Sequence, residues 1–318
     1  MTVTEWIFLG LGAFIVLSAA VSFVIMLRIT MPIAKNVYKT MFTKDSPEKW
    51  GRKCSCPENP EHLRMFREGV EWAKANVERK SQVRIKSGEL NLYGEFYDFG
   101  SKDTVIITAG RAESLMYGYY FAAPYKRCGL NVLVIDQRAT GRSDGDKIGY
   151  GVWEAEDVRC WMAYLKEKLG QRGFVIHGIC TGATTAVYLA AEGAVKAVVL
   201  EGPYKSFLEV LRRRTILGGH KPFPVIYEIK HIIKRNTGID IVKHAPEKYV
   251  QKMTSPALFL CGKQDTSSLP ENSQKLYERC ASRVKRMVWF HEGAHSHLRI
   301  ANPEKYDSAI HEFLKEIG

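Results

Sequence analysis

The residue with the clearest chemical potential is Cys180, which lies in the segment 174–184 with the sequence FVIHGICTGAT. An apolar run leads directly into G-x-C-x-G, with Gly178 two residues before the cysteine and Gly182 two residues after it. Such glycines remove side chains that would collide in a sharp turn from strand to helix, where the central residue has a strained backbone. N–H groups and the dipole at the start of the following helix favour a thiolate. The pattern predicts a cysteine nucleophile, and a buried thiol in a glycine-rich turn is the alternative.

A nucleophile of this kind needs a base, and the base needs a carboxylate that orients it. Asp265 follows an apolar run at 257–260 in the sequence CGKQD, and His295 follows a run at 287–290 in the sequence EGAH. Both therefore lie in loops just past strand ends, on the same side as Cys180. We predict that His295 is the base and that Asp265 orients it. Glu201 and His297 are kept as the alternative acid and base.

Two backbone donors are needed for the oxyanion of a tetrahedral intermediate. The N–H of Thr181, next after the nucleophile, is the first predicted donor. The second is assigned to Arg111 in the loop 109–114 (AGRAES), which follows an apolar run at 104–108. The guanidinium of Arg111 is compatible with two roles, binding an acidic substrate group or simple exposure to solvent.

Short apolar runs alternate with amphipathic helical patterns through most of the chain, which predicts a mostly parallel, doubly wound α/β sheet. The predicted strands are 104–108, 131–135, 174–176, 197–200 and 257–260, and the predicted helices are 152–169, 181–192, 271–281 and 304–317. A helix near 61–76 and an antiparallel hairpin of 82–86 with 90–99, turning at Ser87-Gly88, precede them.

The alternation breaks after residue 200, where about 50 residues separate two predicted strands. A helical apolar stripe occurs there, formed by Val225, Ile226, Ile229, Ile232 and Ile233. An insertion at this point lies over the carboxyl ends of the strands, where α/β sheets bind ligands. We expect a small helical cap at about 204–252.

The first residues predict a membrane anchor. Residues 6–27 are 22 consecutive uncharged residues, a helix about 33 Å long, which is enough to cross a bilayer. A cleaved signal peptide is the alternative, but Glu5 and no basic residue precedes the run. Four basic residues follow it, Arg28, Lys35, Lys39 and Lys44, so the positive-inside rule predicts a single-pass protein of the cell membrane with a cytoplasmic catalytic domain. The expected divisions are 1–28 (anchor), 29–79 (basic juxtamembrane linker and helix) and 80–318 (main domain).

The formal net charge of +12 is concentrated in two stretches. Residues 28–53 hold seven basic and two acidic side chains, and residues 205–250 hold ten basic and four acidic ones. Beside a membrane helix, the first stretch predicts attraction to anionic lipid headgroups. In the second, the three arginines 212–214 cannot share one helix face, so most are expected to be solvated, and docking of the cap on the membrane is a further hypothesis. No nucleic-acid-binding motif accompanies these charges, so we expect no nucleic-acid partner.

Cysteine usage points to a reducing compartment. The seven cysteines are an odd number scattered through predicted strands and helices, which favours free thiols. Cys54-Ser-Cys56 has poor spacing for zinc. We expect neither a metal nor an organic cofactor.

Five motifs occur in an order that resembles the α/β-hydrolase superfamily over residues 80–318, particularly membrane-anchored bacterial serine-hydrolase-like proteins with a short cap. The motifs are AGRAES, DQRATGRSDG at 136–145, GICTG, GKQD and EGAH. The resemblance implies an α/β-hydrolase fold and a triad in the order Cys180, Asp265, His295. Ala109 stands where the family commonly has His, and Cys180 stands where it has Ser. In this second respect the chain is similar to dienelactone hydrolases and bile-acid-CoA amino-acid acyltransferases. Asp136 and Arg138 are expected to shape a loop.

The leading functional expectation is a membrane-anchored hydrolase that cleaves an ester or thioester through an acyl-Cys180 intermediate. An acyltransferase that passes the acyl group to an amine or thiol is the first alternative, because a thioester intermediate reacts well with both. A non-catalytic redox sensor or interaction protein is the second alternative. The expected substrate is a small or lipid-like acyl compound, and a basic cap would suit an anionic one.

Overall fold

The apolar runs form the centre of one eight-stranded sheet in the computed structural model, which describes residues 2–44, 46 and 50–318. Residues 45 and 47–49 of the predicted juxtamembrane linker lie outside the described residues. The strands are β1 (Lys80–Ser87), β2 (Leu90–Tyr97), β3 (Asp103–Thr108), β4 (Asn131–Ile135), β5 (Gly173–Ile179), β6 (Ala197–Glu201), β7 (Ala257–Gly262) and β8 (Lys285–Phe290). Their order is β1-β2-β4-β3-β5-β6-β7-β8, antiparallel for the first two pairs and parallel for the rest. The predicted hairpin and parallel sheet are confirmed.

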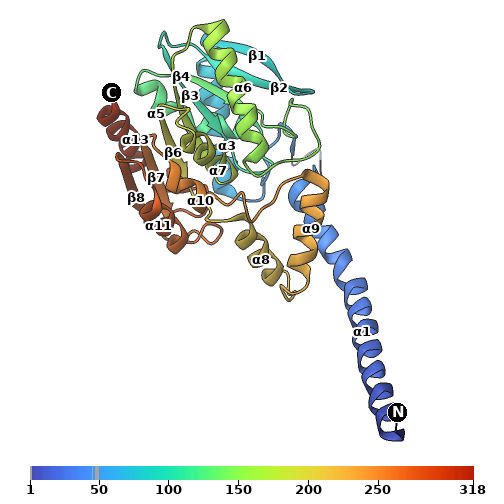
Figure 1. Cartoon of the computed structure of the whole chain (residues 1–318). Coiled ribbons are helices and arrows are strands. Elements are labelled where there is room, and N and C mark those ends of the chain that lie inside the picture. Colours follow the sequence, from blue (N-terminus) through green and yellow to red (C-terminus); the bar gives the residue numbers. More distant parts are fainter. Residues whose placement is uncertain (1, 45, 47–49) are drawn as a thin grey trace.

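Both faces of the sheet are covered by helices, because alternate residues of each strand point to opposite sides (Figure 1). Val105 packs into one apolar core and its neighbour Ile106 into the other. The first core includes α3 (Pro60–Ala75), α4 (Leu115–Gly118), α5 (Ala123–Arg127), α12 (Leu298–Ala301) and α13 (Pro303–Ile317). The second includes α6 (Val152–Leu169), α7 (Thr181–Ala191) and α11 (Pro270–Arg279), with α10 (Pro246–Tyr249) beside α7. Three short 3₁₀ helices are η1 (Val77–Arg79), η2 (Tyr119–Phe121) and η3 (Val250–Lys252).

The strand order places the site-bearing loops together. The chain passes from β3 outward to β4 and then returns to β5 on the other side of β3. Such a switch point opens a crevice at the carboxyl ends of the strands. The loops after β3, β5, β7 and β8 all leave the sheet at this edge because these strands are parallel.

Two helices form most of the predicted cap at 204–252, α8 (Phe207–Leu217) and α9 (Val225–Thr237). The last residues of that range, in α10 and η3, pack against α7 instead. The predicted stripe lies on α9, where Val225, Ile226, Ile229 and Ile233 are buried. In Figure 1 the two helices form a hairpin that extends from the domain alongside α1.

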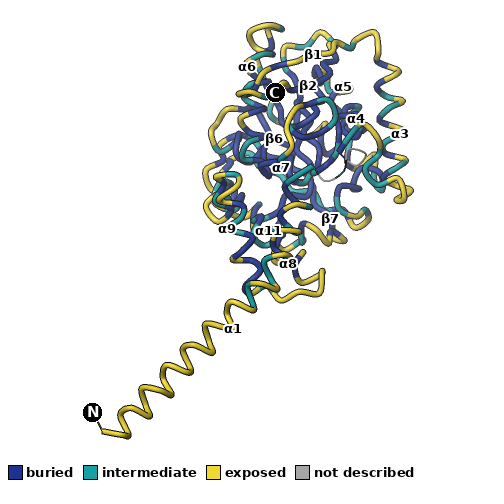
Figure 2. The backbone as a smooth tube through the Cα atoms, turned by 90° about the vertical axis from the view of Figure 1, so that its right-hand side faces the viewer, coloured by how far each residue is buried: buried dark blue, intermediate teal, exposed yellow. Residues whose placement is uncertain are grey.

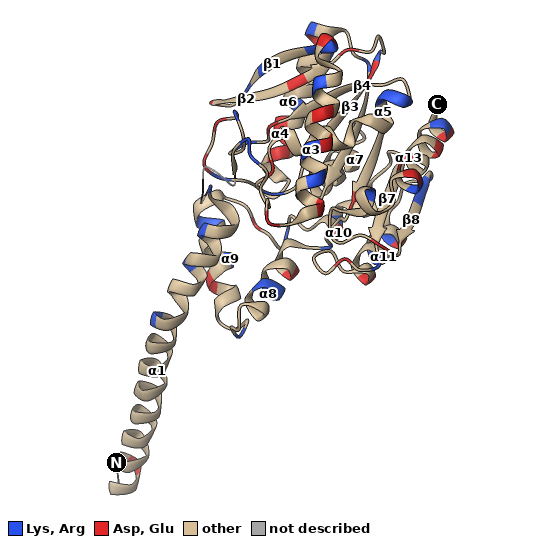
Figure 3. Ribbon diagram, turned by 180° about the vertical axis from the view of Figure 1, so that it is seen from behind, with Lys and Arg blue, Asp and Glu red and all other residues tan. Residues whose placement is uncertain are grey.

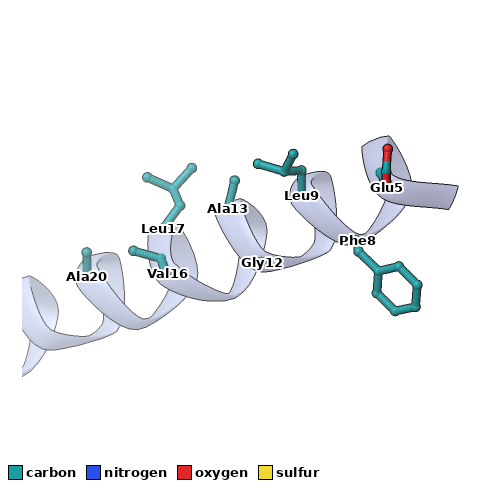
Figure 4. Close-up of a pocket in the computed structure, with 8 residues that line it drawn as sticks. All are labelled: Glu5, Phe8, Leu9, Gly12, Ala13, Val16, Leu17 and Ala20. Carbon is teal, nitrogen blue, oxygen red and sulfur yellow. The ribbon is translucent and has the colours of Figure 1, made fainter. Parts of the chain in front are cut away.

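The amino-terminal helix α1 (Val3–Phe42) is 40 residues long and continues unbroken through Pro32. Its first part is exposed and projects away from the domain (Figure 2), and it is apolar and long enough to be a candidate membrane span. Figure 4 shows one face of this part, which is apolar except for Glu5.

The last part of α1 belongs to the core of the cap. Ala34, Tyr38, Met41 and Phe42 are buried against cap residues. The Phe42 ring lies 4.8 Å from that of Tyr150 and 5.3 Å from that of Phe207. One helix therefore joins the candidate membrane span to the folded domain.

Candidate active site

The turn that carries Cys180 has the strained geometry that its glycines suggest. Cys180 follows β5 and has φ 55° and ψ −107°, a conformation that non-glycine residues rarely adopt. A Cβ on Gly178 would lie 2.2 Å from the carbonyl oxygen of Gly182, and a Cβ on Gly182 would lie 2.1 Å from that of Thr108. The two glycines are required because backbones pass too closely for any side chain. This arrangement presents the thiol at the amino end of α7.

The imidazole of His295 is held by Asp265. Its Nδ1 lies 2.7 Å from Oδ2 of Asp265, whose Oδ1 accepts hydrogen bonds from the N–H groups of Ser267 and Ser268, each at 2.7 Å. A carboxylate only accepts, so Nδ1 carries the hydrogen and Nε2 has the free lone pair. Nε2 is buried, and no described residue meets the distance and angle of a hydrogen bond with it. This nitrogen is therefore free to take a proton.

The electrostatics of His295 suit a base. Burial lowers its pKa, but a Cys180 thiolate and the Asp265 carboxylate outweigh burial and hold the pKa well above its usual value. Proton transfer from the Cys180 thiol to His295 is favoured by the same two interactions.

Gly202, which the sequence analysis did not single out, makes room for this pair. It has φ 55°, and a Cβ there would lie 3.1 Å from Cε1 and 3.2 Å from Nδ1 of His295. The sequence feature that could have identified Gly202 is its position directly after Glu201, the last residue of β6.

The two predicted oxyanion donors face the same cavity as Cys180. Thr181 is the first residue of α7, and Arg111 lies in the loop after β3. Neither N–H donates a hydrogen bond to another described group. The loop passes close to the nucleophile, since a Cβ on Gly110 would lie 3.7 Å from Cβ of Cys180.

A cavity of about 220 Å³ lies between the sheet and the cap. Its wall includes Cys180 and His295, Met41 from the end of α1, and Arg213 and Arg214 from α8. Arg111 is also in the wall, and no Asp or Glu side chain is among the described residues that line it. Arg212 and Arg214 are exposed and Arg213 is half-buried, which agrees with the expectation that most of these arginines are solvated. Arg213 and Arg214 also line the cavity, because α8 lies over it.

The guanidinium of Arg111 has protein partners. Its Nη1 donates to the carbonyl oxygen of Thr40 at 3.1 Å, and it lies 5.8 Å from the centre of the Trp50 ring. Arg111 therefore connects the oxyanion loop to the end of α1. This differs from both roles that its sequence context suggested, binding an acidic substrate group and exposure to solvent.

The alternative acid and base lie in other interactions. Oε2 of Glu201 accepts a hydrogen bond from the hydroxyl of Tyr306, and burial raises the pKa of Glu201 to about 7. His297 interacts with His62 and with Glu61, on the side of the domain that α3 covers. The geometry therefore favours Asp265 and His295.

Glu113 is a further acid in the oxyanion loop, and its side chain is largely buried, with 12% of its surface exposed. Its Oε2 accepts a hydrogen bond from the N–H of Gly110 at 3.0 Å. Burial raises the pKa of Glu113 to about 8, although the hydrogen bond from Gly110 and the charge of His295 oppose the shift. Its position in the motif AGRAES was the one sequence feature that pointed to Glu113.

Asp136 and Arg138 shape a loop, as expected. Asp136 accepts hydrogen bonds from the N–H groups of Leu115 and Arg142, and Arg138 forms an ion pair with Asp157 at 2.6 Å. Over the described residues no three His, Cys, Asp or Glu side chains are grouped as metal ligands.

Comparison with known proteins gives a consistent picture of the fold. The family model of the α/β-hydrolase fold matches residues 103–228. The uncharacterized protein YqkD of Bacillus subtilis is 27% identical over 223 residues, which cover 68% of this chain and 72% of YqkD. The uncharacterized membrane protein YNL320W of Saccharomyces cerevisiae is 24% identical over 259 residues, covering 79% and 82% of the two chains.

Among solved structures, the Pyrococcus furiosus esterase Pf2001 superposes with a TM-score of 0.65 at 22% identity, covering 77% of this chain and 94% of the esterase. At that identity the likeness shows the fold alone. The chain has the α/β-hydrolase fold, and its residues 103–228 match the family model of that fold.

Proposed function

We propose that the protein is a hydrolase of esters or thioesters that uses Cys180 as nucleophile, His295 as base and Asp265 as the residue that orients His295. The observation that carries the proposal is the thiol at a strained elbow, in one cavity wall with an imidazole whose Nδ1 is held by a carboxylate. The esterase among the structural neighbours supports the hydrolase class.

In the acylation step, Nε2 of His295 takes the proton of the Cys180 thiol, and the sulfur attacks the acyl carbonyl carbon. A C–S bond forms while the carbonyl π electrons move to oxygen, where the N–H groups of Thr181 and Arg111 stabilise the negative charge. The bond to the leaving oxygen or sulfur then breaks, and the leaving group takes the proton from His295. The product is an acyl-Cys180 thioester.

In the deacylation step, His295 removes a proton from water, whose oxygen attacks the thioester carbonyl. Collapse of the second tetrahedral intermediate breaks the C–S bond, releases the free acid and returns the proton to Cys180. An amine or thiol that replaces water in this step would make the protein an acyltransferase.

The charges of the cavity favour an anionic substrate. The guanidinium groups of Arg213 and Arg214 have no hydrogen-bond or ion-pair partner among the described residues, and both residues line the cavity. Unpaired guanidinium groups bind carboxylates and phosphates well. An acyl compound that carries a carboxylate or phosphate beyond the scissile bond could therefore bind to Arg213 and Arg214.

We further propose that α1 anchors the protein in the cell membrane, with the domain in the cytoplasm. The exposed apolar part of α1 and the relative named a membrane protein support anchoring, and the basic residues after the span support the orientation. An epitope tag before Thr2 should be digested when protease is added to intact cells, while the domain stays intact. Digestion of the domain alone would reverse the orientation.

The catalytic proposal is tested by intact-protein mass after the full chain, in detergent, is mixed with short and long acyl thioesters and p-nitrophenyl esters. A transient acyl adduct that is absent in Cys180→Ala, with free acid released, is expected. An adduct that persists until an amine or thiol is added would identify the acyltransferase. Absence of adduct and turnover, together with oxidation of Cys180 by peroxide, would favour the redox sensor instead.

A further inference from the structure

The end of the cap exposes an unusual amount of apolar surface. Outside α1, six large apolar side chains are well exposed among the described residues, and four of them lie between the end of α8 and the start of α9. These four are Ile216 (55% exposed), Leu217 (75%), Phe223 (63%) and Tyr227 (64%). We call residues 216–227 the cap tip. A concentration of apolar side chains of this kind marks a contact surface.

The cap tip lies at the level where the candidate membrane span ends. α9 packs along α1, and the Thr30 hydroxyl donates to Oε1 of Glu228 at 2.7 Å. Thr30 follows Leu27, the last residue of the uncharged run, by three residues, or about 4.5 Å along the helix axis. Figures 1 and 3 show the cap tip on the side of the domain that faces the amino-terminal part of α1. A bilayer around α1 would therefore meet the tip.

The charges around the cap tip match an anionic lipid surface. Basic residues lie within the cap tip and on both helices next to it, and Figure 3 shows those of α8 in blue. They are Arg212, Arg213, Arg214, Lys221 and Lys230. The single acid between residues 212 and 230 is Glu228, which is buried and bonded to Thr30. Exposed apolar side chains among basic ones are typical of segments that lie in the headgroup region.

The cap tip is also continuous with the candidate active site. Leu217 lines the cavity that holds Cys180 and is three-quarters exposed. The cavity therefore reaches the surface at the tip.

We propose that the cap tip lies in the headgroup region of an anionic bilayer and that Cys180 receives its acyl substrate, an amphiphile, from that bilayer. The membrane contact is inferred from the exposed apolar and basic residues of the cap alone. The origin of the substrate rests in addition on the proposed function.

The contact is tested with the full chain in nanodiscs of phosphatidylcholine and phosphatidylglycerol. The photoreactive substitutions Phe223→benzoylphenylalanine and Tyr227→benzoylphenylalanine are compared with Val77→benzoylphenylalanine, which occupies an exposed apolar position away from the cap. Lipid adducts, detected by mass, should be at least about fivefold more abundant at the two tip positions. Equal labelling at all three positions, or a cross-linked dimer in place of lipid adducts, would overturn the contact.

The substrate's origin is tested with Phe223→Asp/Tyr227→Asp, since neither residue lines the cavity. Hydrolysis of a long-chain acyl thioester held in vesicles should fall about tenfold, while hydrolysis of a soluble short-chain p-nitrophenyl ester should change less than about twofold. Val77→Asp should alter neither rate. Equal loss on both substrates would contradict delivery from the bilayer. If the unmodified chain hydrolyses neither substrate, the proposed function fails and the substrate inference falls with it, while the labelling experiment still decides the contact.

Discussion

Two sets of residues in this domain each combine histidine with a carboxylate and a possible nucleophile, and only one has the features of a catalytic centre. In the first, Asp265 holds His295 beside Cys180. In the second, the Ser55 hydroxyl lies 3.0 Å from Nε2 of His62, and Nδ1 of His62 lies 3.3 Å from Nε2 of His297. Nδ1 of His297 in turn lies 3.3 Å from Oε2 of Glu61.

The two sets differ in electrostatics and position. The pKa of His295 is raised, although His297 stands only two residues later and has a lowered pKa. Burial lowers the pKa of His62 to about 4, helped by the charge of His297. Burial opposes protonation of the imidazoles in both sets, but only His295 has Cys180 and a buried carboxylate beside it, whose interactions outweigh burial. The surroundings of a histidine therefore indicate a catalytic role better than the types of its neighbouring residues do. Four substitutions test this comparison.

The largest expected effect is loss of the nucleophile. Cys180→Ala should reduce ester or thioester turnover by at least about 10³-fold, because the covalent path is removed. The matched change in the second set, Ser55→Ala, should alter turnover less than about threefold. Initial rates at saturating substrate measure both. A large loss in Ser55→Ala with activity retained in Cys180→Ala would exchange the roles of the two sets.

Next in size is the acid. Asp265→Asn should lower kcat by about 10³-fold, because an amide favours the wrong tautomer and no longer stabilises the imidazolium. Glu61→Gln is the control in the second set and should change kcat less than about twofold. Glu201→Gln probes the alternative acid. Should that variant lose more activity than Asp265→Asn, the assignment of Asp265 is wrong.

A smaller effect is expected at the glycine beside His295. Gly202→Ala should lower kcat about 10- to 100-fold, because the added methyl group displaces the imidazole, and should destabilise the fold by about 1–2 kcal/mol. Gly88→Ala is a control with φ 56° and no atom within 4 Å of the added Cβ, so it introduces the backbone strain alone. Thermal unfolding and kcat are measured for both variants. Equal activity in the two would show that the contact with His295 is unimportant.

The smallest effect concerns pH. Because burial raises the pKa of Glu113 to about 8, its carboxyl is neutral below that pH and charged above it. A carboxylate in the oxyanion loop opposes the developing oxyanion, so kcat should decline a few-fold as pH rises through about 8. Glu113→Gln should remove this decline.

The same substitution has a stability signature. In the unfolded chain Glu113 ionises near 4.5, so the native protein loses stability as pH rises from about 4.5 to 8. Glu113→Gln should flatten that part of the stability profile, measured by denaturant unfolding. An unchanged alkaline decline in kcat, with an unchanged stability profile, would show that Glu113 does not titrate in this range.

Much of the fold could be predicted because its signals are local. Apolar runs marked the central strands, and the stripe from Val225 to Ile233 marked α9. Chain order brought Cys180, Asp265 and His295 to one edge of a parallel sheet, as the geometry requires. The choice of Asp265 over Glu201 and of His295 over His297 rested on position after a strand, and each rival has separate partners in the structure.

The missing parts depend on contacts between distant segments. Met41 and Arg213 enter the cavity wall only because α1 and α8 pack over the sheet. Glu113 is noteworthy through burial and Gly202 through its contact with His295, and neither property can be read from neighbouring residues. The helical continuation of α1 to Phe42 passes Pro32, a residue that usually ends or kinks a helix, and is held by packing on the cap.

Because α1 is one unbroken helix, it limits how far the domain can move relative to the candidate membrane span. A flexible tether would let the domain rotate and rise over an area of membrane, but α1 is continuous to Phe42, and Met41 in its last turn is part of the cavity wall. With α1 in the membrane as proposed, the tilt of this one helix would set the height and orientation of Cys180 above the bilayer. A change in membrane thickness that altered this tilt would then act directly on the geometry between Met41 and the rest of the cavity.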